Sequence, residues 1–355
     1  MRRVPIPTPY SSGMTVSIVV LAGGVGGSRF VLGVREAARR RWPSDGDRGT
    51  TAQIVVVANT GDDLWLSGVR LQPDVDSLLY ALAGVNDVER GWGRASDSER
   101  VSDELRAWGA GWPWFTLGDL DLGTHIARTG WLRDGLTVSE VVARLAARWP
   151  LGVRLLPMTD AEVDTHVVTA GGRLHFQEWW TLHRASLPAI GFENDGIEAA
   201  APGAGVLEAI ASADAVLLAP SNPVVSIGPI LSVPGIADAL AAAAGRVVGV
   251  SPIIGGAVVR GMADACLAAL DVPTAADAVG LRYGPRGGHG GADRAALPGL
   301  LDTWLIAEED AALAPGLEAA GLTALVRPLW MRDPDTSAAL ASAALDAALG
   351  RVAPG

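Results

Sequence analysis

Residues 17–27 read Ser-Ile-Val-Val-Leu-Ala-Gly-Gly-Val-Gly-Gly, a short apolar run that breaks abruptly into closely spaced glycines. A continuous apolar run of this length is typical of a parallel strand buried on both faces. The glycines would let main-chain N–H groups approach a phosphate at the start of a helix near Ser28. No Gly-Lys-Ser/Thr follows, as it would in a Walker loop, and Arg29 stands at the last glycine position of a dinucleotide fingerprint. A plain tight turn without a ligand is therefore an alternative interpretation of these glycines. The candidate phosphate-binding residues are Gly23, Gly24, Gly26 and Gly27.

The same pattern of a buried run followed by loop residues recurs along the chain. The other runs are Gln53–Ala58, Ala215–Ala219 and Arg246–Val250. They are followed by Asn-Thr-Gly-Asp-Asp, Pro-Ser-Asn-Pro and Ser-Pro-Ile-Ile-Gly-Gly. In a doubly wound sheet the ligand crevice lies beyond the carboxyl ends of the strands. We therefore expect these loops to converge on one site, although they are far apart in sequence.

Helical segments fit between these strands, which predicts an α/β fold. The expected helices cover Arg29–Arg41, Ser77–Leu82 and Val138–Arg148, the last with Thr137 as its cap. Alternating segments at Thr165–Thr169 and Arg173–Trp179 predict a β-hairpin. The expected architecture is a Rossmann-like, doubly wound, mostly parallel sheet with a small inserted lobe that contains this hairpin.

This pattern divides the chain into four segments. Residues 1–13 lack the apolar region of a signal peptide, and we expect them to be a disordered extension. The core is predicted at 14–150 and 205–355, and the inserted lobe at 151–204. The glycine-rich tract 284–291 is expected to form a mobile loop.

Composition excludes several classes of protein. A net charge of −11 over 355 residues argues against broad capture of a nucleic-acid backbone. No apolar run approaches a membrane-spanning length. The single cysteine, Cys266, excludes an intrachain disulfide and a cysteine-rich zinc site, and it fits a cytoplasmic location.

Two close pairs of aspartates surround the exit of the second predicted strand. The pairs are Asp62 with Asp63, and Asp74 with Asp76. Mg²⁺ favours oxygen ligands and commonly bridges substrate phosphates, so one aspartate from each pair can hold it. Another can orient or deprotonate a hydroxyl nucleophile. Turn formation and helix capping are alternative roles for these side chains.

Two further segments supply candidate ligand contacts. Ser221, Asn222 and Pro223 follow the third predicted strand and suit a nucleotide or phosphate cradle, with a structural Asn-Pro turn as the alternative. Arg128 can reach a ligand phosphate or acid group. For its neighbour His125 we favour a structural role, because nothing local identifies a nucleophile or metal partner.

Taken together, these strings resemble the 2-phospho-L-lactate transferase family, especially its actinobacterial members, from Met14 onward. The resemblance is carried by LAGGVGGSRF, NTGDDLW, QPDVDSLLY, RGWG, LGDLDLGTHIAR, LLPMTD, HFQEWW, LAPSNPVVSIGPI, VSPIIGG and RGMAD. It is specific by combination, because no single fragment identifies the family. The N-terminal extension and the tract 284–291 depart from the family pattern without interrupting these motifs.

The resemblance implies a Mg²⁺-dependent, homodimeric enzyme of coenzyme F-420 biosynthesis. The acceptor would be the deazaflavin Fo, 7,8-didemethyl-8-hydroxy-5-deazariboflavin, and the donor a three-carbon phosphorylated acid linked to GDP. The products would be GMP and coenzyme F-420-0, or the dehydro form of this coenzyme. The acid is lactate in the archaeal form and enolpyruvate in the mycobacterial form, and the actinobacterial strings favour enolpyruvate.

The family pattern also assigns roles to matching positions. It places Mg²⁺ and Fo chemistry at Asp62, Asp63 and Asp76, with Asp76 as the preferred contact to the Fo ribityl chain. The residue before the LGD string, here Thr116, would contact the acceptor. Ser221, Asn222 and Pro223 match the nucleotide-proximal string, and Asn59 would lie among the substrate-binding residues.

Two other functions compete with the transferase. The first glycine-rich turn is also compatible with an NAD(P)-dependent oxidoreductase, although Asn59 stands where a ribose-binding acid would be expected. A non-enzymatic protein that binds a nucleotide or Fo would use the same crevice without turnover.

Overall fold

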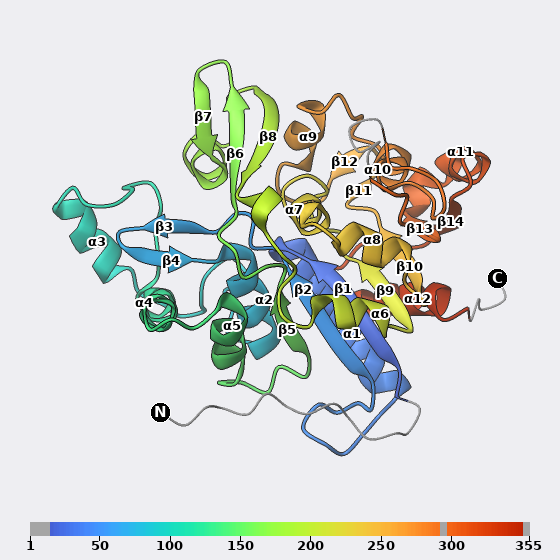
Figure 1. The fold of residues 1–355 in the computed structure, drawn as a ribbon, viewed down its shortest axis with the longest axis horizontal. Coiled ribbons are helices and arrows are strands. Elements are labelled where there is room, and N and C mark those ends of the chain that lie inside the picture. The colour runs from blue at the N-terminus through green and yellow to red at the C-terminus, as the bar shows by residue number, and fades with distance from the viewer. Residues whose placement is uncertain (1–14, 292–296, 351–355) are drawn as a thin grey trace.

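A computed structural model describes residues 15–291 and 297–350, so the extension expected at 1–13 lies outside the described residues. Its centre is a seven-stranded sheet in which every pair of neighbours runs parallel (Figure 1). In spatial order the strands are β14 (Thr323–Val326), β13 (Thr303–Ile306), β10 (Arg246–Val250), β9 (Ala215–Leu218), β1 (Ser17–Ala22), β2 (Gln53–Ala58) and β5 (Arg154–Pro157). The expected α/β fold is confirmed.

Strand β1 shows why this sheet is buried on both sides. Ile18, Val20 and Ala22 point into one helical layer, whereas Val19 and Leu21 point into the other, and all five are fully buried. Successive side chains of a strand alternate between its faces, so an uninterrupted apolar run satisfies both layers at once. The opening stretch of the sequence analysis is therefore the central strand of a three-layer structure.

Helices cover both faces of the sheet. The layer that packs on Ile18 and Val20 contains α1 (Gly24–Arg41), α2 (Pro73–Ala83), α5 (Val138–Ala146) and α12 (Pro334–Ala348). The other contains α6 (Val206–Ala211), α7 (Ile227–Ser232), α8 (Ile236–Ala241), α9 (Ala263–Ala268), α10 (Ala276–Tyr283) and α11 (Ala314–Ala319). Within the described ranges, no helix has both the length and the apolar character needed to cross a membrane.

Two helices begin earlier than expected. Helix α1 starts at Gly24 rather than Arg29, because the glycines themselves form its first turns. Helix α2 starts at Pro73, a residue whose fixed φ suits the first helical position. Asp76 therefore lies inside the first turn of α2, and the capping role considered for it is wrong. The cap predicted for α5 is confirmed, since Thr137 and Glu140 form a capping box.

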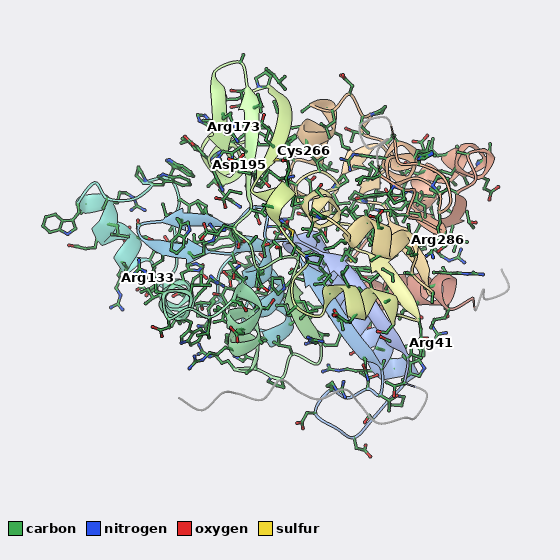
Figure 2. All side chains as sticks on the ribbon, viewed as in Figure 1. Arg41, Arg133, Arg173, Asp195, Cys266 and Arg286 are labelled. Atoms are coloured by element: carbon green, nitrogen blue, oxygen red, sulfur yellow. The ribbon has the colours of Figure 1, made fainter. Side chains whose placement is uncertain are left out.

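Smaller elements lie outside the central sheet. They are β3 (Leu64–Leu66) and β4 (Val69–Leu71), α3 (Arg100–Ala107), α4 (Asp119–Arg133), β11 (Ile253–Ile254) with β12 (Ala257–Val258), and 3-10 turns at Ile197–Ala199 and Glu308–Leu313. A three-stranded antiparallel sheet contains β7 (Gly172–His175), β6 (Asp164–Thr169) and β8 (Ala189–Asp195). The ion pair of Arg173 with Asp195 joins β7 to β8 (Figure 2).

The expected hairpin is confirmed, but its second strand is shorter than predicted. The strand ends at His175, and a π-helical turn follows at Glu178–Leu182. Trp179 is fully buried in that turn and donates its indole hydrogen to Leu187 O. Strand β5 also lies within 151–204, and it pairs with β2 in the central sheet. The division of the chain into domains at these bounds stays a prediction.

The glycine-rich tract 284–291 is tied to the core by the side chain of Arg286 and by backbone hydrogen bonds. Arg286 donates to Ala243 O at 2.7 Å and Gly245 O at 2.9 Å, and it pairs with Asp302 at 2.7 Å (Figure 2). A backbone bridge also joins Pro285 to Leu301. The mobility expected for this tract stays a prediction.

Candidate active site

The loops after the neighbouring strands β1 and β9 meet, as the doubly wound pattern predicts. Ser221 Oγ donates to Gly23 O at 2.7 Å and accepts from Gly23 N at 3.1 Å. This reciprocal pair joins residues that are 198 positions apart in the chain. The glycine loop and the Ser-Asn-Pro loop therefore form one wall of a common site.

Asn59 connects the loop after β2 to the same wall. Its side-chain nitrogen donates to Asp74 Oδ2 at 2.9 Å, to Val225 O at 3.2 Å and to Asp62 Oδ1 at 3.3 Å. Its oxygen accepts from Gly61 N at 2.9 Å. The amide is fully buried, so it acts within the protein as the link between three segments. Direct contact of Asn59 with a substrate stays a prediction.

The glycines at the start of α1 allow other protein groups to approach closely. A Cβ at Gly23 would overlap the Asp74 carboxylate, and one at Gly27 would lie 2.5 Å from Ser221 Oγ. Asp74 also accepts a hydrogen bond from the backbone of Gly24 at the helix N-terminus. A carboxylate thus takes the position where sequence reasoning expects a phosphate. Binding of a phosphate by Gly23, Gly24, Gly26 and Gly27 stays a prediction.

Asp62 and Asp63 lie buried beyond the end of β2. Gln177 Nε2 donates to Asp62 Oδ2 at 2.9 Å, and Gln72 Nε2 donates to Asp63 Oδ2 at 2.7 Å. Burial, and then the charges of Asp74 and Asp63, hold the pKa of Asp62 well above its usual value. Burial likewise raises the pKa of Asp63, although Arg70 opposes the shift. In the absence of a cation, the folded protein therefore favours the protonated form of both carboxyls.

This pair fits a hard divalent cation. Among the described residues, Asp63 Oδ1 is buried without a hydrogen-bond partner. Mg²⁺ prefers carboxylate oxygens, and a nearby cation would stabilise the charged carboxylates against the burial that raises their pKa values. The donor set at Asp62 and Asp63 therefore suits the expected Mg²⁺.

Asp76 belongs to a second buried network, and the charges of Asp76 and Arg128 also act on the pKa of Asp63. Its carboxylate forms an ion pair with Arg128, whose side chain is fully buried. His125 Nδ1 lies 2.9 Å from Arg128 Nη1 and 3.6 Å from Asp76 Oδ2, and His125 Nε2 lies 3.4 Å from Asp121 Oδ1. Tyr80 donates its hydroxyl hydrogen to Asp121 at 2.7 Å. Arg128 is thus positioned to hold Asp76, and its direct contact with a ligand stays a prediction.

Asp76, Asp121 and His125 also have the geometry of a metal site, since one ligand atom from each lies within 4.8 Å of the others. Two features make this group less suitable for Mg²⁺ than Asp62 and Asp63. The Arg128 guanidinium already neutralises Asp76. An imidazole ligand is more typical of transition metals than of Mg²⁺.

A cavity of about 300 Å³ opens beside Asp63. It is lined by Thr60, Asp63, Trp65, Arg70, Leu132, Arg133, Leu136, Thr137, Val138, Thr159, Asp160, Ala161 and Glu162. Its size lies at the lower end of the range found for small-molecule sites. A ligand in this cavity would reach the buried carboxylates from the side of α4 and α5.

Comparison with known proteins agrees with this arrangement. The profile of the family described as 2-phospho-L-lactate transferase CofD matches residues 18–316. The chain belongs to this family. A phosphoenolpyruvate transferase of Thermobifida fusca is 50% identical over 337 residues, which cover 94% of this chain and 98% of that protein. A phosphoenolpyruvate transferase of Nocardia farcinica is 46% identical over 338 residues, or 93% and 94% of the two chains.

A third phosphoenolpyruvate transferase, from Streptomyces griseus, is 48% identical over 335 residues, or 93% and 98% of the two chains. The resemblance to the transferase family is therefore confirmed. Among solved structures, a protein of Bacillus halodurans described as a member of the UPF0052 family aligns with a TM-score of 0.58 at 16% identity. The alignment covers 94% of this chain and all of that one. At this identity the likeness shows a shared fold and no more.

The remaining motif residues of this CofD family member differ in their surroundings. Thr116 is half-buried in the loop before α4, and the same loop contains the stacked rings of Trp112 and Trp114, whose centroids are 4.6 Å apart. Asn222 Oδ1 accepts from Val224 N at 2.9 Å, as in the turn considered as its alternative role. Contacts of Thr116, Asn222 and Pro223 with substrates stay predictions.

Sequence reasoning missed several supporting residues. Gln177 in the HFQEWW string and Gln72 in the QPD string hold the two aspartates, and Asp121 and Tyr80 complete the Asp76 network. A signal was present, because Gln72 and Gln177 stand inside strings quoted for the family. Nothing in one sequence indicates that two glutamines 105 positions apart face the adjacent carboxylates Asp62 and Asp63.

Proposed function

We propose that the chain is a phosphoenolpyruvate transferase of coenzyme F-420 biosynthesis, as its relatives' names suggest. It would act in the cytoplasm as a homodimer. It would transfer a phosphoenolpyruvyl group, or the related phospholactyl group, from a GDP-linked donor to the ribityl hydroxyl of Fo. The observation that carries the proposal is the meeting of the glycine, Gly-Asp-Asp and Ser-Asn-Pro loops around buried, partly neutralised aspartates.

The proposed reaction is an in-line displacement at the distal phosphorus of the donor. The Fo hydroxyl oxygen forms a bond to that phosphorus, the bond to the GMP oxygen breaks, and the electron pair leaves with GMP. Asp62 and Asp63 would hold Mg²⁺, which would supply positive charge to the diphosphate. The protein does not form a covalent intermediate in this scheme.

We propose that Asp76 binds the acceptor hydroxyl of Fo and takes up its proton. Its Oδ2 is buried and has no hydrogen-bond partner among the described residues, so it can accept the hydroxyl proton. Arg128 holds the other oxygen and fixes the direction in which Oδ2 points. Orientation of the nucleophile supplies a large part of the acceleration in reactions of this kind.

The close packing of the glycine loop favours a transferase over an NAD(P)-dependent oxidoreductase. A dinucleotide fingerprint needs room for a pyrophosphate at the start of its helix. Here the Asp74 carboxylate lies against Gly23 and Gly24.

The experiment is a donor comparison. Purified protein is incubated with Fo, Mg²⁺ and GDP-linked enolpyruvate, lactate or glycerate, and product mass and GMP are followed together. We expect turnover with the enolpyruvate donor to exceed that with the others. Folded protein that turns over no donor would refute the transferase. Thermal protection by Fo without any change in its mass would indicate a binding protein instead.

A further inference from the structure

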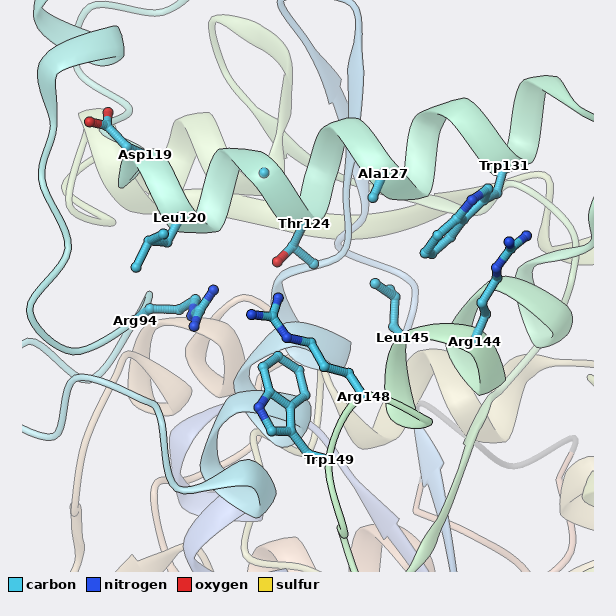
Figure 3. Close-up of a pocket in the computed structure, with 11 residues that line it drawn as sticks. Arg94, Asp119, Leu120, Thr124, Ala127, Trp131, Arg144, Leu145, Arg148 and Trp149 are labelled. Atoms are coloured by element: carbon cyan, nitrogen blue, oxygen red, sulfur yellow. The ribbon is translucent and has the colours of Figure 1, made fainter.

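A second cavity, of about 310 Å³, lies between another face of α4 and helix α5 (Figure 3). Its wall contains Arg94, Asp119, Leu120, Gly123, Thr124, Ala127, Trp131, Arg144, Leu145, Arg148 and Trp149. Asp121, His125 and Arg128 are absent from this wall, because they point from α4 toward α2. The cavity is therefore separate from the proposed transfer site.

The wall carries three arginines arranged on two tryptophans. The guanidinium carbons of Arg148 and Arg94 lie 4.6 and 5.7 Å from the ring centre of Trp149. That of Arg144 lies 4.5 Å from the ring centre of Trp131. Figure 3 shows the ends of Arg94 and Arg148 pointing toward one another below Thr124. Stacking on a ring fixes a guanidinium while leaving its N–H groups free to donate.

These arginines lack acidic partners. Over residues 15–291 and 297–350, no salt bridge or side-chain hydrogen bond joins Arg94, Arg144 or Arg148 to a carboxylate, and Arg94 Nε is buried without any partner. Asp119, the acid in the wall, accepts instead from Ser98 Oγ at 2.6 Å and from the Val101 N–H at 3.0 Å. Two guanidinium groups that point toward each other without a counter-charge repel each other, and an anion bound between them would remove this electrostatic repulsion.

We propose that this cavity binds a small phosphorylated anion, with its phosphate between Arg94 and Arg148 and its organic part against Trp149. The planar donor forks of two arginines match the oxygens of a phosphate. The volume admits a small phosphate ester rather than a dinucleotide. A local cation cluster in a chain of net charge −11 provides an anion site without making the whole surface basic.

The test measures binding of inorganic phosphate and of phosphoenolpyruvate by calorimetry, in buffers matched with chloride. The proteins are the full chain, the double variant Arg94→Gln/Arg148→Gln, and the control Arg106→Gln. Arg106 is an exposed arginine of α3 outside the cavity, paired with Asp103. We expect saturable binding of at least one probe to the parent and to the control. The double variant should bind that probe about tenfold more weakly or worse, since both charged donors are lost.

A conservative variant guards against loss of the fold. Arg148→Lys keeps the charge but removes the donor fork, and it should bind the probe more weakly at an unchanged melting temperature. Fo transfer at low phosphate should be the same in this variant as in the parent, because Arg148 lies outside the transfer site. Equal affinity in the parent and the double variant, or no saturable binding of either probe, would overturn the proposal. If the parent is an oligomer that binds neither probe and the double variant is a monomer, the arginines belong to a subunit interface instead.

Discussion

Asp76 carries the most specific chemical prediction at the scale of single residues. Removing its charge deprives the fully buried Arg128 of its ion-pair partner, which costs about 3–5 kcal/mol in comparable pairs. Asp76→Asn should therefore lower the melting temperature as well as the rate of transfer. The double variant Asp76→Asn/Arg128→Gln should recover stability but not turnover, because it restores a neutral pair while the acceptor carboxylate is still missing. Melting curves and single-turnover GMP release separate the two effects.

An exposed ion pair gives the matched control. Arg40 and Asp335 also form a close pair, but the Asp335 side chain is 83% exposed, and such pairs contribute little to stability. Asp335→Asn should leave both measurements unchanged. Near-parent turnover in the double variant at Asp76 and Arg128 would remove Asp76 from the acceptor site.

Cys266 gives a prediction about reactivity. Burial raises the pKa of this thiol from 9.0 to about 12, so its thiolate fraction in the folded protein falls about a thousandfold. Alkylation by iodoacetamide at pH 8 should be very slow in native protein and fast in denaturant. Mass spectrometry over time measures both rates. Rapid native labelling would show that α9 opens readily.

Close packing makes a prediction at the scale of elements. A Cβ at Gly23 would collide with Asp74 and lie 2.9 Å from Ser226 Cβ. Gly23→Ala should therefore cost about 1–3 kcal/mol and disturb the contact of the first loop with α2. Gly130→Ala in α4 is the control, because open space surrounds that position. A better helix former there should stabilise the protein by about 1 kcal/mol. Chemical denaturation compares the two variants.

The same scale shows what sequence periodicity predicts well. The strands Ser17–Ala22, Gln53–Ala58 and Arg246–Val250 were predicted with the observed bounds, because a buried parallel strand needs apolar side chains on both faces. Helix starts were predicted less well. The glycines of α1 disfavour a helix by intrinsic propensity, yet packing against Ser221 and Pro220 O stabilises one there. The π-helical turn at Glu178–Leu182 follows from burial of Trp179, which local sequence does not reveal.

At the scale of the whole molecule, the meeting of the loops after β1, β2 and β9 was predictable, because these strands are neighbours in the sheet. The side-chain partners were not, since Arg128 to Asp76 and Gln177 to Asp62 are contacts between distant segments. Sequence motifs grouped Asp76 with Asp62 and Asp63. In the structure, Asp76 is held by Arg128 and His125, whereas the other two are held by glutamines.

The buried aspartates predict how stability depends on pH and on metal. Folding raises the pKa of Asp62 and Asp63 above the usual 3.8, so the folded state binds their protons more tightly than the unfolded chain does. This contribution to stability is present below pH 3.8 and is lost as the pH rises through the raised values. Without metal, these two groups should therefore lower the melting temperature of the protein as the pH rises from 3.8 through their raised pKa values.

Mg²⁺ should reverse this loss at neutral pH. A ligand that binds only the folded state at one hundred times its dissociation constant adds about 2.7 kcal/mol of stability. The melting temperature of the parent should therefore rise with Mg²⁺, and that of Asp62→Asn/Asp63→Asn should not. An equal rise in both proteins would place the cation elsewhere, and the Asp76, Asp121 and His125 group would then be the next to test.

The position of β1 between β2 and β9 has a consequence during synthesis on the ribosome. On one side of β1, Ile18 pairs with Ile54 of β2, which is synthesised soon after it. On the other side its partner is Ala215 of β9, which is synthesised much later. At roughly 5–20 residues per second, ribosomes need about ten to forty seconds to make the intervening chain. Throughout that interval one edge of this apolar strand is unpaired. Nascent chains halted before residue 215 should therefore bind chaperones strongly, and chains extended past β9 should release them.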